Sequence, residues 1–241
     1  VLDPPSVDPD ALLQSEAPEA IEWNISWVNA DDVWGLGYTG QGAVVAGQDT
    51  GYQWDHPALQ AKYRGWNGAT ADHAYNWHDA IHSGGGGCGA NATAPCDDSQ
   101  HGTHTMGTMV GDDGAGNQIG MAPGAKWIGC RNMDQGNGTP ATYAECYQWF
   151  VAPTDLNNLN ADPALAPDVI NNSWSCPGSE GCTDPNVLLT VVENVRAAGI
   201  VTVHSVEGMR GYPKDPVYGA MKAAAAHFTT CLAVDLGRHG I

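Results

Sequence analysis

The sequence predicts an α/β fold built around a doubly wound, mostly parallel sheet. Short apolar runs bounded by turn residues alternate with stretches of helical periodicity, which is typical of buried parallel strands joined by crossover helices. The chain has 241 residues, enough for one sizeable core, and its 31 glycines and 15 prolines indicate a globular protein with many tight turns. We expect one main domain over residues 31–241, preceded by an arm over residues 1–30 that packs on its surface.

The elements follow in a regular order. Asp31 is expected to cap a short helix that ends at Gly35 or Gly37. Parallel strands are predicted at residues 43–48, 125–130, 168–173 and 200–205. Helices are predicted near residues 101–110, 140–151 and 185–198.

Two segments show the local reasoning. Asp184 and Pro185 predict the cap and first turn of the last helix, and Gly199 predicts its end. Residues 65–95 include four consecutive glycines and show no periodicity, so we expect an insertion loop between the first strand and the helix at 101–110.

The charge excludes several functions. With 9 Lys and Arg against 27 Asp and Glu, the net charge is −18, which repels phosphate backbones and anionic lipids. We therefore expect no nucleic-acid partner. Apolar runs are far too short to span a membrane, and the first residues lack the basic start and apolar core of a secretory signal, so either a leader was removed earlier or none existed.

The cysteines favour an oxidising compartment. Cys88 with Cys96, and Cys176 with Cys182, lie in turn-like surroundings and can close small disulfide loops, whereas Cys-x-x-Cys metal spacing is missing. The three others leave at least one thiol unpaired, and the sequence does not choose a pairing among them: Cys130, Cys146 and Cys231.

Two motifs carry chemistry. Asp49-Thr50-Gly51 closes an apolar strand, and His101-Gly102-Thr103-His104 opens a helix. At the carboxyl end of a strand, a carboxylate can accept the Nδ1–H of an imidazole and fix its tautomer. A histidine at a helix start is kept neutral by the positive end of the dipole, which suits a general base. Alone, Asp-Thr-Gly is equally consistent with a strand-ending turn.

Together these motifs resemble the subtilisin-like (S8) serine peptidases. The histidine box lies downstream of the Asp motif in the family's order, and residues 120–125 and 169–174 match the family's strand entry and cleft strand. The disulfide-bearing insertions are most similar to extracellular, bacillopeptidase-type members. The resemblance implies a subtilisin-like fold and a secreted serine endopeptidase that acts on polypeptides.

The resemblance also implies residue roles. Asp49 would orient the base His101, whereas His56 and His104 would be structural. Extended substrate would lie between two segments, Gly136-Asn137-Gly138 and Ser173-Trp174-Ser175. The family usually has glycine where this chain has Ser175, which places the fit of the first side-chain pocket in question.

The rest of the machinery is missing. No serine follows Ser205, no Asn follows Asn194, and Glu207 lies where the family has its oxyanion segment; a solvated loop carboxylate is the preferred interpretation of Glu207. Without a nucleophile, we expect the chain alone to be inactive. We expect the fold to be incomplete at its C-terminal side; the alternatives are a catalytically silent, peptide-binding pseudo-protease, or a misread segment at 206–232.

No cofactor is expected. Asp112, Asp113 and Asn117 offer oxygen ligands for a structural calcium, but their spacing matches no strict loop motif and a solvated acidic turn is preferred. We predict no catalytic metal, and we expect a monomer.

Overall fold

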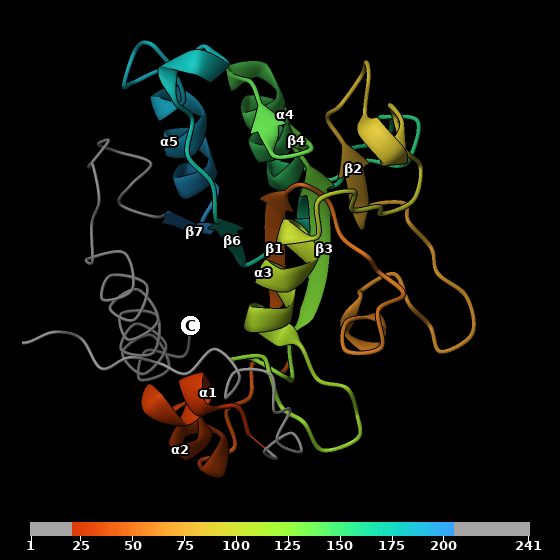
Figure 1. Cartoon of the computed structure of the whole chain (residues 1–241), viewed down its shortest axis with the longest axis vertical. Helices are drawn as coiled ribbons and strands as arrows, with labels where there is room; N and C mark the ends of the chain where they lie inside the picture. Colours follow the sequence, from red (N-terminus) through yellow and green to blue (C-terminus); the bar gives the residue numbers. More distant parts are fainter. Residues whose placement is uncertain (1–20, 205–241) are drawn as a thin grey trace, which may run out of the picture.

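The computed structural model describes residues 21–204, and their central feature is a five-stranded sheet in the order β2-β3-β1-β6-β7. Every neighbouring pair in this sheet is parallel. Its strands are β1 (Val44–Asp49), β2 (Trp77–Asp79), β3 (Lys126–Arg131), β6 (Val169–Asn172) and β7 (Val201–His204). The predicted fold class, a mostly parallel α/β sheet, is confirmed (Figure 1).

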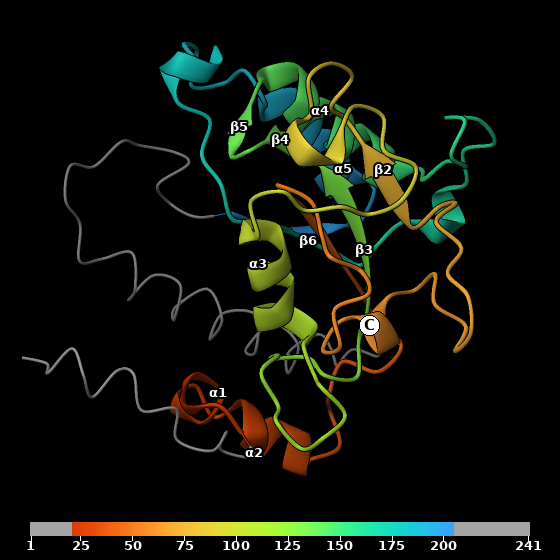
Figure 2. The same cartoon turned by 45° about the vertical axis from the view of Figure 1, so that its right-hand side comes forward.

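Helices cover both faces of this sheet. Figure 2 shows α3 (His101–Val110) on one side and α4 (Pro140–Val151) with α5 (Leu189–Ala197) on the other. Alternate residues of one strand serve the two cores: Val45 packs with Met106 and Val110 of α3, whereas Ala46 packs with Tyr147 and Phe150 of α4. This alternation on a sheet buried from both sides is the signature of a doubly wound fold.

Predicted and observed helices agree where the caps are local. The predicted bounds of α3 and α4 agree with the observed ones. Thr139 and Thr142 form a capping box at the start of α4, with Pro140 as its first residue. In contrast, α5 begins at Leu189 because Asp184 accepts the Asn186 N–H and closes a separate turn instead of capping the helix.

The prediction of a structureless insertion over residues 65–95 was incomplete. Trp77–Asp79 forms the edge strand β2, which pairs with β3 and is buried. Three residues are too few to show an alternating pattern, so the strand could not be seen in the sequence. Three-residue 3₁₀ turns occur at Gln60–Lys62, Gly86–Cys88, Pro163–Leu165 and Gly178–Glu180.

Between residue 21 and the first strand lie two short helices, α1 (Trp23–Trp27) and α2 (Ala30–Gly35). Asp31 lies in the first turn of α2 rather than at its cap, which is Asn29. The Glu22 N–H donates to the Gln118 carbonyl, so the chain contacts the domain here. Most of the predicted arm, residues 1–20, and all predictions for residues 205–241 lie outside the described residues.

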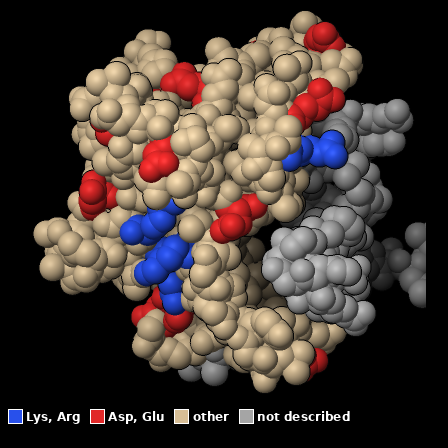
Figure 3. Space-filling view, turned by 180° about the vertical axis from the view of Figure 1, so that it is seen from behind, with Lys and Arg blue, Asp and Glu red and all other residues tan. Residues whose placement is uncertain are grey.

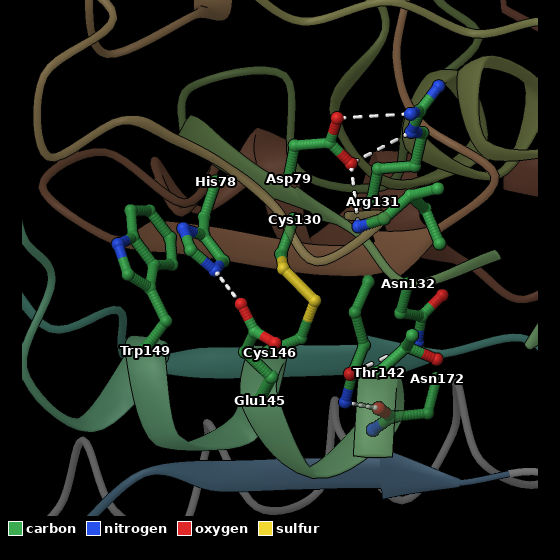
Figure 4. Close-up of a disulfide and its surroundings, with 12 residues drawn as sticks. His78, Asp79, Cys130, Arg131, Asn132, Thr142, Glu145, Cys146, Trp149 and Asn172 are labelled. Atoms are coloured by element: carbon green, nitrogen blue, oxygen red, sulfur yellow. Dashed lines mark hydrogen bonds and ion pairs between the residues drawn. A yellow bond between two sulfur atoms is a disulfide. The ribbon is translucent and has the colours of Figure 1, made fainter. Parts of the chain in front are cut away.

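The described residues contain three disulfides: Cys88–Cys96, Cys130–Cys146 and Cys176–Cys182. Two are the loops expected from the sequence. The third joins β3 to α4 through the core, beside the ion pair of Asp79 with Arg131 (Figure 4). Cys231 lies outside the described residues.

The face of the molecule in Figure 3 is sparsely charged. On the face in Figure 3, most side chains are uncharged and the Lys and Arg residues lie among Asp and Glu. Between residues 21 and 204, no helix is long and apolar enough to cross a membrane.

Candidate active site

Asp49 ends β1 in a buried, hydrogen-bonded position. Its side chain is 1% exposed. Oδ1 accepts the Thr50 N–H at 2.7 Å, and Oδ2 lies 3.3 Å from the Thr105 hydroxyl, which is the donor. These contacts fix the carboxylate and aim Oδ1 toward α3.

His101 meets this carboxylate from the first turn of α3. Its Nδ1 lies 2.6 Å from Asp49 Oδ1, across 52 residues of sequence, while 47% of the ring is exposed. The next residue must be glycine: a Cβ at Gly102 would stand 2.1 Å from the Gly51 carbonyl oxygen. The absent side chain therefore lets α3 approach the end of β1 closely enough for the contact.

Asp97 supports both partners, although the sequence analysis did not single it out. Oδ1 accepts the Thr50 hydroxyl at 2.8 Å, and Oδ2 accepts the Thr103 N–H at 2.9 Å. The Thr50 hydroxyl oxygen in turn accepts the Gly102 N–H at 3.0 Å. One carboxylate thus ties the residue after Asp49 to the first turn of α3, a role that its place just before the helix could have suggested.

This arrangement suits proton transfer. When Nδ1 donates to Asp49, Nε2 is left as the basic nitrogen, and the buried carboxylate stabilises the imidazolium that forms when the ring takes a proton. A half-exposed ring beside a buried, oriented carboxylate is the geometry of a general base and its orienting acid.

Of the two segments predicted to bind substrate, residues 136–138 lead into α4 and residues 173–175 follow β6. Gln135 and Gly136 both have positive φ, at 49° and 84°, and form the turn between β4 (Met133–Asp134) and β5 (Asn137–Gly138). Residues 173–175 follow β6, where the Ser173 hydroxyl oxygen accepts the Asn171 amide at 2.9 Å.

Tyr143 of α4 joins these segments. Its ring stacks on Trp174 with centroids 4.0 Å apart, and the Gly138 backbone hydrogen-bonds to its phenol oxygen. The hydroxyl donates to Glu180 at 2.6 Å; burial, together with this carboxylate, raises the pKa of Tyr143. Sequence reasoning missed Tyr143 because two of its partners, Trp174 and Glu180, are distant along the chain.

The carboxylates of the acidic turn at residues 112–117 have protein partners. Asp112 Oδ2 lies 3.1 Å from the Lys62 ammonium, and Asp113 accepts the Ala115 and Asn117 N–H groups. Burial would raise the pKa of Asp112, but the Gly114 N–H and Lys62 outweigh it and lower the pKa. Across the described residues, no three His, Cys, Asp or Glu side chains are grouped to hold a metal.

Of the other residues named in the sequence analysis, His56 and His104 lie in the described part of the chain. His56 has a structural contact, since its Nδ1 accepts the Ala58 N–H at 3.1 Å, and His104 lies on the exposed side of α3. Glu207 and the oxyanion segment lie outside the described residues.

Comparison with known proteins agrees with this architecture. The model of the subtilase family matches residues 40–206. Bacillopeptidase F of Bacillus subtilis (strain 168) is 45% identical over 163 residues, which are 66% of this chain and 11% of that protein. Subtilisin E of the same organism is 26% identical over 226 residues, 88% of this chain and 49% of that protein. The chain therefore spans about half or less of the length of these relatives.

A second, shorter match overlaps the end of the first. The short chain dehydrogenase model matches residues 186–241, so the sequence after residue 206 is matched by this model and not by the subtilase model. Because 167 of the 241 residues match the first model, and the sheet, Asp49 and His101 lie within that match, the chain belongs to the subtilase family.

Proposed function

We propose that the chain carries the acid and base of a subtilase-type serine endopeptidase, with His101 as general base and Asp49 as its orienting acid. The observation that carries the proposal is the 2.6 Å contact between His101 Nδ1 and the buried Asp49. Family membership supports the reaction class, peptide-bond hydrolysis through an Asp-His-Ser triad.

The proposed substrate is a polypeptide held as an added strand between residues 136–138 and 173–175. Gly136 and Asn137 are exposed, whereas Gly138 is buried against the ring of Tyr143. The strand β5 therefore offers an exposed backbone edge that packs on this ring. Main-chain hydrogen bonds to such an edge bind extended peptides with little dependence on sequence.

The nucleophile is the missing part of this proposal. No serine follows Ser205 in the sequence, and the chain covers only half of subtilisin E. We propose that the serine and the oxyanion donor belong to a part of the complete enzyme that this chain does not cover. The alternative is a pseudo-protease that binds peptides without cutting them.

Labelling with a fluorophosphonate tests the proposal, because this reagent reacts with an activated serine. The 241-residue chain should remain unlabelled, whereas an enzyme in which the subtilase sequence continues to its serine should be labelled. In that enzyme His101→Ala should abolish labelling, and His104→Ala, three residues along the same helix, should retain it. Labelling of the bare chain would contradict the proposal, and a continued subtilase sequence without serine would favour the pseudo-protease.

A separate experiment tests whether the sequence after residue 206, where the match to the subtilase model ends, is misread. Trypsin cleaves after Arg196 and Arg210, so a single peptide of residues 197–210 spans the end of the subtilase match. Detection of this peptide by mass spectrometry in the natural protein would show that residues 206 onward are not a misread sequence. Its absence, with a subtilase-like peptide in its place, would support the misreading.

We further propose a monomeric extracellular protein without nucleic-acid or membrane partners. Three disulfides in the described part of the chain and the net charge of −18 support this environment. A relative with an extracellular name supports it as well: Minor extracellular protease Vpr of Bacillus subtilis (strain 168) is 31% identical over 130 residues, 54% of this chain and 15% of that protein.

A further inference from the structure

Three side-chain amides are buried at the edge of the sheet where the central strands end. Gln48 and Asn132 are 0% exposed, and Asn172 is 2% exposed. Gln48 directly precedes Asp49 in β1, Asn132 follows the last residue of β3, and Asn172 ends β6. Burying an amide is costly unless its donors and acceptors are paired. The proposed acid and base use none of these three groups, so their burial calls for another explanation.

The three amides form one row of hydrogen bonds across the sheet. Asn132 Nδ2 donates to Gln48 Oε1 at 3.1 Å, and Gln48 Nε2 donates to Asn172 Oδ1 at 2.6 Å. Asn172 Nδ2 donates to the Val203 carbonyl of β7 at 2.9 Å. Because a carbonyl oxygen can only accept, it fixes the direction of every bond in this amide row. Asn132 and Asn172 are the outer amides of the row in Figure 4.

The amide row continues the sheet where backbone pairing stops. The paired residues of β1 and β6 end at Gly47 and Asn171. Gln48 and Asn172 come next in the two strands, and there the strands are joined by the side-chain bond. Within residues 21–204, the one nitrogen or oxygen atom of the three side-chain amides without a partner is Asn132 Oδ1. Buried polar networks with most groups paired fix one arrangement of the segments that they join.

The amide row lies on the face of the sheet opposite the candidate acid and base. Successive side chains of a strand point to opposite faces. Asp49 is directed to His101 of α3, whereas Ala46 packs on α4, so Gln48 shares the α4 face with Ala46. The row is linked to the acid through the backbone, because the Asn132 N–H donates to the Asp49 carbonyl at 3.0 Å. Any effect of the row on the site is therefore one of position.

We propose that Gln48 is a positioning residue that sets the separation of the two substrate segments, residues 136–138 and 173–175. The chain runs from Asn132 through β4 into the first segment, and from Asn172 directly into the second. Gln48 is bonded to the side chain at the root of each segment. The inference rests on the proposed function, since it concerns the groove in which that function holds an extended peptide.

Hydrogen exchange of the 241-residue chain, measured by mass spectrometry, tests the positioning role without catalysis. Gln48→Met keeps the side-chain length but breaks both bonds, so exchange should accelerate about tenfold or more in both segments and stay unchanged in α3. Asn132→Leu breaks only the bond on the side of residues 136–138, and exchange should accelerate there and not at residues 173–175. Gln41→Met is the matched control, since this exposed glutamine bonds only to Gly37 and Thr39.

Unchanged exchange in both segments would overturn the positioning role. So would equal acceleration throughout the chain, which would indicate a general loss of stability. If Gln48→Met does not fold, Asn132→Leu alone makes the same decision, because its effect should be confined to one segment.

Kinetics in an enzyme whose subtilase sequence continues to its serine give a second test. Gln48→Met should raise KM for an extended peptide about fivefold or more and leave kcat within about twofold. Its fluorophosphonate labelling rate should equal that of the parent enzyme, because this reagent does not occupy the peptide groove. A KM equal to the parent value, or labelling that falls together with hydrolysis, would overturn the positioning role. An unlabelled parent enzyme would instead contradict the proposed function, and the exchange measurement would still decide the role of Gln48.

Discussion

At the scale of single residues, the candidate site depends on one carboxylate and one imidazole. In a complete enzyme, Asp49→Asn should lower kcat by roughly 10⁴, because an amide stabilises neither the required tautomer nor the imidazolium. Steady-state peptide hydrolysis measures this. Asp113→Asn, a surface carboxylate bonded only within its own turn, should leave kcat unchanged; a loss of less than tenfold for Asp49→Asn would remove Asp49 from the proposed role.

Gly102 makes a second residue-scale prediction. A Cβ there would meet the Gly51 carbonyl at 2.1 Å and the Asp49 Cβ at 3.1 Å, and backbone atoms cannot move aside. Gly102→Ala should therefore destabilise the fold by about 2 kcal/mol or more, through overpacking. Gly107→Ala, in the same helix with no atom within 4 Å, should instead stabilise by up to about 1 kcal/mol. Urea unfolding of both variants makes the comparison, and equal effects would contradict it.

At the scale of elements, His78, His82 and Glu145 link β2 and its following loop to α4. Both Nε2 atoms lie against Glu145, at 2.7 and 2.9 Å. Burial would raise the pKa of Glu145, but the hydrogen bonds with the two histidines outweigh it and lower the pKa. Hydrogen bonds with Asn91 and then Glu145 raise the pKa of His82.

These opposite shifts define a pH window. The stabilisation from His82 is present below its ordinary pKa of 6.5, and it is lost as the pH rises through the raised pKa of the folded state. The stabilisation from Glu145 is present above its ordinary pKa of 4.5, and it is lost as the pH falls through the lowered pKa of the folded state. The contact should therefore stabilise most between 4.5 and 6.5. Because His82 is half exposed, Glu145→Gln should cost no more than about 1 kcal/mol near pH 5.5, and less near pH 8.5. Urea unfolding at both pH values tests this; an equal cost at both would contradict it.

Tyr143 makes the other prediction at this scale. Tyr143→Phe keeps the stack on Trp174 but loses the bonds to Glu180 and Gly138, so residues 136–138 should open more easily. Native-state hydrogen exchange at the Gly138 N–H should accelerate about fivefold or more, the equivalent of about 1 kcal/mol. Tyr75→Phe, which removes an exposed hydroxyl bonded to the Asn160 carbonyl, is the control and should not change exchange at Gly138.

Elements with local signals could be predicted from sequence, and elements defined by distant partners could not. The bounds of α3 and α4 follow from residues within one turn of each end. The Asp49 and His101 motifs identified the pair that the structure brings together. The edge strand β2 forms because it pairs with β3. The roles of Tyr143 and of the Cys130–Cys146 pair depend on contacts with segments that are distant in the sequence.

At the scale of the whole molecule, the Cys130–Cys146 bond ties the central sheet to the helical layer beneath it. Both cysteines are fully buried, and the bond closes a 16-residue separation, so chain entropy predicts a loss of about 3 kcal/mol when Cys130→Ala and Cys146→Ala are combined. The matched control removes Cys176 and Cys182, which are separated by 6 residues near the surface, and should cost about 2 kcal/mol or less. Guanidinium unfolding measures both double variants. A larger loss for the surface pair would mean that the stability of this fold depends on the segment around residues 176–182 more than on the sheet–helix core.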